Sequence, residues 1–327
     1  MRTVPLGNTG VQVSVFCLGT MYLGSREDEA TSYRLLDQYV EAGGSFLDTA
    51  NTYARWVPGC LGGESEALLG KWMRDRKNRS QVFIATKVGF GYPGVERGLR
   101  ARQIETECEK SLRRLGTDTI DLYQAHVDDR NTPMEETMEA FDRLVRAGKV
   151  RFIGASNFSV WRLEEARWVS QTHGWTQYCS IQQHYSYLRP RPGASFAPQV
   201  AANADLLDYC RARGLTLLAY SPLLGGAYTR ADRSFPAQYQ GPDSDARLAV
   251  LKAIAAEVGA TANQVVLAWM ARMGTSVRQS APPVIPLVAA STAAQMQENL
   301  AALDLTLSPD QMARMRRVST PVSTSDS

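Results

Sequence analysis

The sequence lacks the features that mark a membrane protein, a disulfide-stapled secreted domain or a structural metal site. No apolar run approaches the ~18 residues that span a bilayer, and the five cysteines include no C-x-x-C pair. The three histidines, His126, His173 and His184, do not have metal-ligand spacing. No secretory signal is found at the N-terminus. We therefore expect a cytoplasmic protein with reduced cysteines and no membrane partner or metal ion.

The sequence also lacks a strong excess of charge of one sign. Its net charge is +3 over 327 residues, and basic residues alternate with acidic ones, as in Arg74-Asp75-Arg76. Such a balance gives no basic patch for nucleic acid, so no nucleic-acid partner is expected. Hydrophobic residues make up 44% and charged residues 21%, an ordinary globular composition. The length suits a single α/β barrel.

A third missing feature is the glycine motif of a Rossmann sheet. The first buried strand, expected at 14–18, is followed by Gly19-Thr20-Met21-Tyr22-Leu23-Gly24, which is not G-x-G-x-x-G. A hairpin is predicted over 3–13, and eight strand–helix alternations follow, which favours a (β/α)8 TIM barrel of the α/β class over a doubly wound sheet. Later strands are expected to begin near residues 45, 81, 119, 150, 179, 215 and 283. Helices are expected over 28–41, 64–75, 101–115, 134–147, 160–172, 203–213 and within 245–273.

The same pattern predicts the domain organisation. Residues 1–318 form a single barrel domain, and the Ser/Thr-rich segment 319–327 is a flexible tail. Two segments, 185–200 and 225–245, exceed normal loop length and follow strand ends. We expect them at the C-terminal face of the barrel, as substrate walls or lids, with disordered insertions as the alternative.

Three successive strand candidates end in an ionisable side chain: Asp48, Lys87 and His126, with Tyr53 just after the first. In a barrel these strand ends meet at one mouth. Asp48 can supply the counter-charge of a buried Lys87. Lys87 in turn can lower the pKa of Tyr53 from about 10 by ~3 units, so that Tyr53 acts as a general acid/base. His126 can hydrogen-bond a substrate oxygen. Each residue alone has a structural explanation, as a cap, a solvated charge or a packing group, but four together favour catalysis.

From end to end the chain resembles the aldo-keto reductases. The resembling stretches are 18–21 (LGTM), 46–53 (FLDTANTY), 63–70 (GESEALLG), 85–87 (ATK), 121–126 (DLYQAH), 148–158 (GKVRFIGASNF) and 219–223 (AYSPL). The resemblance implies the catalytic tetrad Asp48, Tyr53, Lys87 and His126. It also implies an oxidoreductase that transfers hydride between a nicotinamide and a carbonyl compound, such as an aldehyde, ketone or sugar.

The resemblance further implies a set of cofactor contacts. These are Gly19, Thr20, Met21, Asp48, Ser156, Asn157, Gln182, Tyr220, Ser221, Leu223, Ser291, Gln295, Glu298 and Asn299. The adjacent Gln183 leaves the register at Gln182 open. The last βα unit departs from the family, because no Lys or Arg occurs between Pro286 and Asn299 to hold a 2′-phosphate. We therefore expect NADP or NAD, with a weakened grip on NADP that Arg230 or Arg233 could offset.

The sequence says less about the substrate. Candidate contacts at the mouth are Tyr22, Arg55, Trp56, Tyr92 and Asp128, with Arg130 and Arg189 nearby. Aromatic and polar groups together suit a sugar or another hydroxylated carbonyl compound, whereas Arg55 could bind an anionic group. Two other functions stay open: a redox-sensing regulatory subunit with low turnover, and a Schiff-base lyase with Lys87 as its nucleophile.

Overall fold

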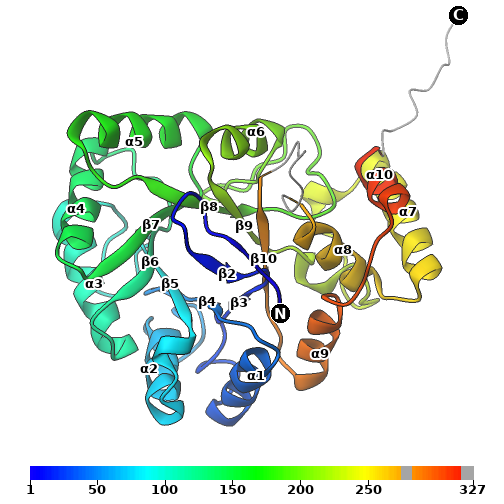
Figure 1. The fold of residues 1–327 in the computed structure, drawn as a ribbon, viewed down its shortest axis with the longest axis horizontal. Helices are drawn as coiled ribbons and strands as arrows, with labels where there is room; N and C mark the ends of the chain where they lie inside the picture. The colour runs from blue at the N-terminus through cyan, green and yellow to red at the C-terminus, as the bar shows by residue number, and fades with distance from the viewer. Residues whose placement is uncertain (274–281, 318–327) are drawn as a thin grey trace, which may run out of the picture.

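The fold is a closed barrel of parallel strands in the order β10-β3-β4-β5-β6-β7-β8-β9 (Figure 1). This computed structural model describes residues 1–273 and 282–317. The strands are β3 (Cys17–Gly19), β4 (Phe46–Asp48), β5 (Phe83–Val88), β6 (Ile120–Ala125), β7 (Val150–Ser156), β8 (Tyr178–His184), β9 (Thr216–Tyr220) and β10 (Val284–Val288). The predicted (β/α)8 barrel is thus confirmed, and β3 begins three residues later than the strand expected at 14–18.

The predicted hairpin lies at the N-terminal end of the barrel. Strand β1 (Thr3–Pro5) pairs antiparallel with β2 (Gln12–Ser14), and Figure 1 shows β2, in dark blue, over the centre of the barrel. The backbone N–H of Gly7 donates to Thr216 Oγ1 over 2.7 Å, and that hydroxyl donates to the carbonyl of Pro5 over 3.0 Å. Because Thr216 begins β9, the hairpin covers the end of the barrel opposite the strand C-termini.

Helices surround the barrel (Figure 1), and the first six lie within one residue of the predicted ranges, whereas α10 was not predicted. They are α1 (Glu29–Glu41), α2 (Glu64–Arg76), α3 (Ala101–Leu115), α4 (Met134–Arg146), α5 (Val160–His173), α6 (Ala204–Arg213), α7 (Pro242–Val258), α8 (Ala262–Ala271), α9 (Ala293–Ala301) and α10 (Pro309–Arg317). The region expected within 245–273 forms two helices. Gly259, with φ of 65°, ends α7, and Thr261 caps α8 through a reciprocal capping box with Gln264.

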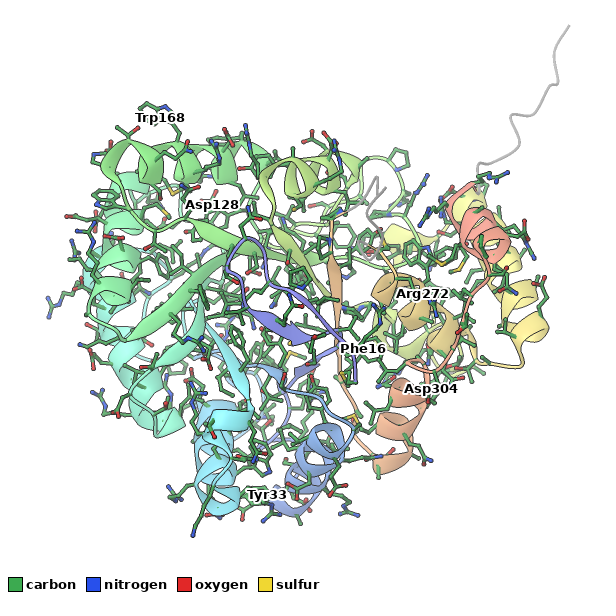
Figure 2. All side chains as sticks on the ribbon, viewed as in Figure 1. Phe16, Tyr33, Asp128, Trp168, Arg272 and Asp304 are labelled. Atoms are coloured by element: carbon green, nitrogen blue, oxygen red, sulfur yellow. The ribbon has the colours of Figure 1, made fainter. Side chains whose placement is uncertain are left out.

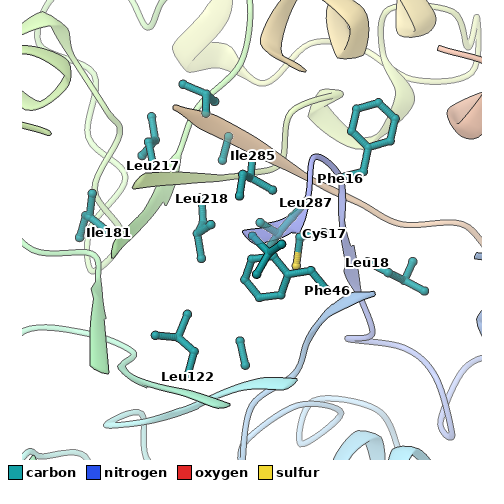
Figure 3. Close-up of a cluster of buried hydrophobic side chains, with 14 of the residues drawn as sticks. Phe16, Cys17, Leu18, Phe46, Leu122, Ile181, Leu217, Leu218, Ile285 and Leu287 are labelled. Atoms are coloured by element: carbon teal, nitrogen blue, oxygen red, sulfur yellow. The ribbon is translucent and has the colours of Figure 1, made fainter. Parts of the chain in front are cut away.

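Apolar side chains from the strands form a buried core on the inner and outer faces of the barrel, and Figure 3 shows part of it. Leu122, Ile181, Leu218 and Ile285 are each fully buried. Strands β5 and β6 are buried along their whole lengths because helices cover their outer faces. Polar and charged side chains project outward from the helices. Trp168 of α5 is an exception, because it is a large apolar side chain that also points outward (Figure 2).

Both long segments pack on the barrel and on each other. The backbone N–H of His184 donates to the carbonyl of Val200 over 3.2 Å, and that of Arg191 donates to the carbonyl of Gln238 over 2.7 Å. The second segment contains the short 3-10 helix η3 (Ala237–Tyr239), and η2 (Leu224–Gly226) overlaps its start. A third short helix, η1 (Arg79–Gln81), precedes β5. The disordered-insertion alternative is therefore wrong for both segments, whereas the predicted tail 319–327 lies outside the described residues.

The described residues contain no single helix that is long and apolar enough to cross a bilayer; α7 and α8 meet that criterion only as a pair bent by 95°. In the same part of the chain, no group of three or more His, Cys, Asp or Glu side chains could hold a metal ion.

Candidate active site

The four predicted catalytic residues meet at the C-terminal end of the barrel. Asp48 is the last residue of β4, Lys87 lies in β5, and His126 directly follows β6. Tyr53 lies in the turn after β4, where its backbone N–H donates to the carbonyl of Ala50 over 3.2 Å. Asp48 and Lys87 are fully buried, and Tyr53 is 9% exposed. The register of neighbouring parallel strands explains why residues far apart in sequence share one mouth.

Lys87 is the hub of this cluster. Its ammonium donates to Asp48 Oδ2 over 2.6 Å, to Tyr53 Oη over 2.7 Å and to the backbone carbonyl of Thr49 over 2.8 Å. An ammonium has three N–H donors, so all three are used. Tyr53 Oη accepts this bond from Lys87 and in turn donates to Asp48 Oδ2 over 3.3 Å. Asp48, Tyr53 and Lys87 therefore form one closed hydrogen-bonded cluster with a buried cation at its centre.

Burial, rather than the neighbouring cation, dominates the acidity of Tyr53. Desolvation, followed by the charge of Asp48, raises the pKa of Tyr53 well above its usual value. The sequence-based expectation that Lys87 lowers this pKa is thus wrong for the structure as it stands, because the Asp48 carboxylate beside Lys87 opposes that cation. Burial also lowers the pKa of Lys87, an effect that Asp48 opposes. Tyr53 consequently keeps its proton at neutral pH.

His126 is held as a neutral imidazole. Burial lowers the pKa of His126 well below its usual value, and the positive charges of Lys87 and Arg55 add to this shift. Its ring centroid lies 5.9 Å from that of Tyr53 and 4.7 Å from that of Phe90, in edge-on contact with both. His126 Nδ1 is buried and finds no hydrogen-bond partner among the described residues. A neutral imidazole in this position can donate one N–H to a carbonyl oxygen.

Two glutamine side chains complete the surroundings of Asp48. Gln182 Nε2 donates to Asp48 Oδ1 over 2.8 Å, and Gln124 Nε2 approaches the same oxygen at 3.3 Å. Sequence reasoning missed Gln124, although it stands two residues after the core residue Leu122 in β6. The alternation of strand side chains could have indicated that Gln124 points inward one layer above Leu122.

The same alternation decides between the two adjacent glutamines of β8. Gln182 reaches Asp48 inside the barrel, whereas Gln183 Nε2 donates to the carbonyl of Phe158 over 2.7 Å. The two side chains therefore lie on opposite faces of β8. The structure places the predicted residue, Gln182, at the mouth beside the tetrad.

A polar group also gathers where β7 and β9 end. Asn157, in a left-handed conformation with φ of 59°, donates from Nδ2 to the carbonyl of His126 over 2.9 Å and to Ser156 Oγ over 3.0 Å. Its Oδ1 accepts from Tyr220 Oη over 2.9 Å and from the backbone of Val200 over 3.1 Å. Asn157 thereby ties three strand ends to one long loop, and Ser156 keeps its hydroxyl proton for a ligand.

Comparison with known proteins identifies the family. The sequence model described as the aldo/keto reductase family matches residues 15–320. The chain belongs to the aldo-keto reductase family. It is 34% identical over 323 residues to the uncharacterized oxidoreductase YrpG of Bacillus subtilis, covering 94% of this chain and 92% of that relative. It is 31% identical to norsolorinic acid reductase stcV of Emericella nidulans, covering 93% of this chain and 77% of that relative.

A solved structure supports the same assignment. The thermostable aldo-keto reductase Tm1743, crystallised with the inhibitor epalrestat, superposes with a TM-score of 0.75 at 29% identity. The match covers 98% of this chain and 100% of that one. Fold and family therefore agree over nearly the whole length of this aldo-keto reductase.

Aldo-keto reductases generally use a nicotinamide cofactor, and the polar groups described above fit one. The Ser156 hydroxyl and the Gln182 side chain lie beside the tetrad, where a carboxamide needs donors and acceptors. The half-buried ring of Tyr220 lies at the same mouth. The other predicted contacts near this end occupy the ends of β3 and β9 and the loops after them: Gly19, Thr20, Met21, Ser221 and Leu223.

The predicted adenosine end lies at the start of α9. Thr292 caps this helix by accepting from the backbone of Gln295 over 3.2 Å, and Gln295 Oε1 accepts from the backbone of Ser291 over 2.8 Å. These two hydrogen bonds resemble a capping box, except that Gln295 accepts from the residue before the cap rather than from the cap itself. The remaining N–H groups of the first turn give a partial positive charge that favours a phosphate.

No Lys or Arg side chain occurs between Pro286 and Asn299, the segment that contains the start of α9. Glu298 accepts from the Thr261 hydroxyl at the α8 cap over 2.8 Å, and Asn299 donates to the carbonyl of Ala289 over 3.0 Å. Of the two suggested substitutes, Arg230 already holds Asp232 through two hydrogen bonds of 2.9 and 2.5 Å, and Arg233 Nε lies 3.9 Å from the same carboxylate. The start of α9 is thus a capped helix end without a cationic side chain of its own.

The substrate candidates divide into two groups. Trp56 is 44% exposed and packs edge-on against Tyr22 at 6.5 Å and against Tyr53 at 6.3 Å, so these rings line the approach to the tetrad. Arg55 is exposed, and its Nη1 donates to the backbone carbonyl of Gly91 over 2.6 Å. Asp128, in contrast, is 8% exposed and accepts from Arg162 Nε over 2.9 Å; it also pairs with Arg130. Its charge is satisfied inside the protein, and nothing in the geometry supports its predicted role at the substrate. Tyr92 lines a pocket together with Arg55 and Phe90.

Proposed function

We propose that this aldo-keto reductase reduces the carbonyl group of an aldehyde, ketone or sugar with a nicotinamide cofactor, and that Tyr53 donates the proton. The observation that supports this most directly is the buried Lys87 ammonium, bonded at once to Asp48 and to Tyr53 Oη. Close relatives carry the name norsolorinic acid reductase, which favours reduction over oxidation as the direction.

The chain supplies the positioning and the proton. The chemistry contributed by a bound nicotinamide is hydride transfer to the carbonyl carbon. Tyr53 gives its phenol proton to the carbonyl oxygen, and the neutral His126 donates an N–H to the same oxygen as negative charge develops. As Tyr53 loses its proton, Lys87 stabilises the phenolate across 2.7 Å. Asp48 keeps Lys87 charged in a fully buried site.

The geometry argues against the Schiff-base alternative. A nucleophilic lysine must be neutral and must approach the substrate carbon. Lys87 uses its three donors on Asp48, Tyr53 and Thr49, and its side chain is 0% exposed. The regulatory-subunit alternative predicts low turnover, so a measurement of kcat distinguishes it from the proposed function.

Replacement of Tyr53 by Phe tests the proposal. We expect Tyr53→Phe to lower kcat for a reactive aldehyde by about 10²–10⁴-fold, the usual contribution of a general acid. Cofactor affinity, measured by quenching of protein fluorescence, should stay within about threefold. Activity is followed by the absorbance of the reduced nicotinamide over a panel of aldehydes, ketones and sugars. Retention of most activity by the variant would show that Tyr53 is not the proton donor.

Cofactor choice is the second part of the proposal. Because the α9 segment carries no cation between Pro286 and Asn299, we propose that the preference for NADPH over NADH is weak or reversed. Steady-state kinetics with both cofactors measures this. Gln295→Arg, which places a guanidinium in the first turn of α9, should shift the ratio of kcat/KM toward NADPH. A strong NADPH preference in the unmodified protein would contradict the proposal.

A further inference from the structure

Beside the tetrad lies an open pocket that neither the proton relay nor the cofactor contacts use. It has a volume of ≈ 540 Å³ and is lined by Arg55, Phe90, Gly91, Tyr92, Pro93, Val95, Arg97 and Pro198. Phe90 connects it to the site, since its ring lies 4.7 Å from that of His126. A substrate whose carbonyl oxygen reaches Tyr53 and His126 can therefore extend its far end into this pocket.

The pocket carries two positive charges that no carboxylate neutralises within the described residues. Arg55 Nη1 donates to the backbone carbonyl of Gly91 over 2.6 Å, and Arg97 Nη2 donates to the backbone carbonyl of Asp128 over 3.1 Å. Each guanidinium has five N–H donors, so most of them are left over. Both side chains are exposed at the pocket. The backbone bonds hold the guanidiniums in place without satisfying their charge.

Two carboxylates near the pocket, Glu107 and Asp128, are paired with cations outside it. Glu107 pairs with Lys110 over 2.7 Å and accepts from Tyr92 Oη over 2.7 Å, which also fixes the Tyr92 ring as a pocket wall. Asp128 is paired with Arg162 over 2.9 Å. Among the residues that the structure describes, Arg55 and Arg97 are the only charged ones that line the pocket, so its lining carries two positive charges although the whole chain is close to neutral.

We propose that this pocket binds a carboxylate carried by the substrate, so that the preferred substrates are aldehydes or ketones with a carboxylate at the end remote from the carbonyl. Arg55 and Arg97 bind the carboxylate, and Phe90 and Tyr92 pack on the intervening apolar or aromatic part. The inference rests on the proposed function and deepens it. Arg97 is a specificity-determining residue that the sequence did not single out, because only the fold brings it beside Arg55.

Two probes of matched shape test the proposal. The enzyme's kcat/KM is measured for 4-carboxybenzaldehyde and for 4-formylbenzamide, which share the aldehyde and differ in the charge of the remote group. We expect the ratio of these values to favour the carboxylate by tenfold or more at low salt. It should fall by about tenfold in Arg97→Gln and in Arg55→Gln, the size of one charge-assisted hydrogen bond. It should also fall as ionic strength rises.

Arg102→Gln is the matched control. Arg102 is an exposed arginine in the first turn of α3, and its replacement removes the same charge without touching the pocket. The ratio should not change in this variant.

A ratio near one in the unmodified enzyme, with both aldehydes turned over, would overturn the inference and leave the proposed function intact. A high ratio that neither pocket variant lowers would overturn the assignment of the carboxylate to this pocket. Failure to turn over either aldehyde with either nicotinamide would instead count against the proposed function. Thermal unfolding of each variant shows whether a loss comes from misfolding.

Discussion

At the scale of single residues, Lys87 is where structure and chemistry depend on each other most. A fully buried ammonium is tolerated because Asp48, Tyr53 and the Thr49 carbonyl satisfy its donors. Asp48 is itself surrounded by amides from Gln124 and Gln182. Removing either ion leaves the other charged, buried and unpaired, which costs far more than removing both.

Lys87→Met should therefore destabilise the protein by about 3–5 kcal/mol and also suppress turnover. The double variant Asp48→Asn/Lys87→Met should recover part of that free energy of unfolding while staying inactive. Urea unfolding followed by circular dichroism measures the first effect, and aldehyde reduction measures the second. A double variant that is less stable than both single variants would contradict the pairing argument.

At the scale of elements, hydrogen bonds from α2 hold the residues that follow β3 and β4 at the mouth of the barrel. The hydroxyl of Ser65, in the first turn of α2, bonds to the hydroxyls of Thr20 and Thr49 over 2.8 and 2.9 Å. Further along, α2 approaches the end of α3 so closely that a Cβ at Gly70 would lie 2.2 Å from the carbonyl oxygen of Arg114. Glycine is required there by backbone contact, not by its own φ.

Gly70→Ala should therefore destabilise the protein by about 1–3 kcal/mol, although alanine is the better helix former. The matched change Arg74→Ala, on the exposed side of the same helix, should stay within about 0.5 kcal/mol. Midpoints of urea unfolding decide this. An equal or higher stability of Gly70→Ala would mean that α2 and α3 can separate without cost.

At the scale of the whole molecule, burial of neutral histidines makes stability depend on pH. Desolvation lowers the pKa of His184 to about 4, and the side chain is 9% exposed between Phe196, Tyr220 and Tyr239. Its Nδ1 bonds to Tyr239 Oη over 2.8 Å. Above about pH 6.5 both folded and unfolded chains hold His184 neutral. Below that pH the unfolded chain binds a proton that the folded chain does not, so stability falls.

The expected loss from His184 between pH 7 and pH 5 is about 2 kcal/mol, from a pKa that is lower in the folded state. His184→Gln removes this titration. The difference in free energy of unfolding between the two pH values should therefore be smaller in the variant by about that amount. Urea titrations at both pH values measure it, and an unchanged difference would show that His184 is solvated enough to protonate in place. His126, whose pKa is also lowered, should add in the same direction.

Local signals along the sequence were enough to predict the barrel and the four residues of the tetrad, although not Gln124 beside Asp48. Strand and helix signals are local, so the alternating elements could be read in order, and Asp48, Lys87 and His126 each stand at a strand end that the barrel brings to one mouth. The absence of Lys and Arg between Pro286 and Asn299 was equally visible in the sequence. Three features follow only from the tertiary structure. They are the raised pKa of Tyr53, the ion pair of Asp128 with Arg162, and the presence of Arg55 and Arg97 in the lining of one pocket. These depend on burial and on partners far along the chain, and through-space effects of that kind leave no local pattern to read.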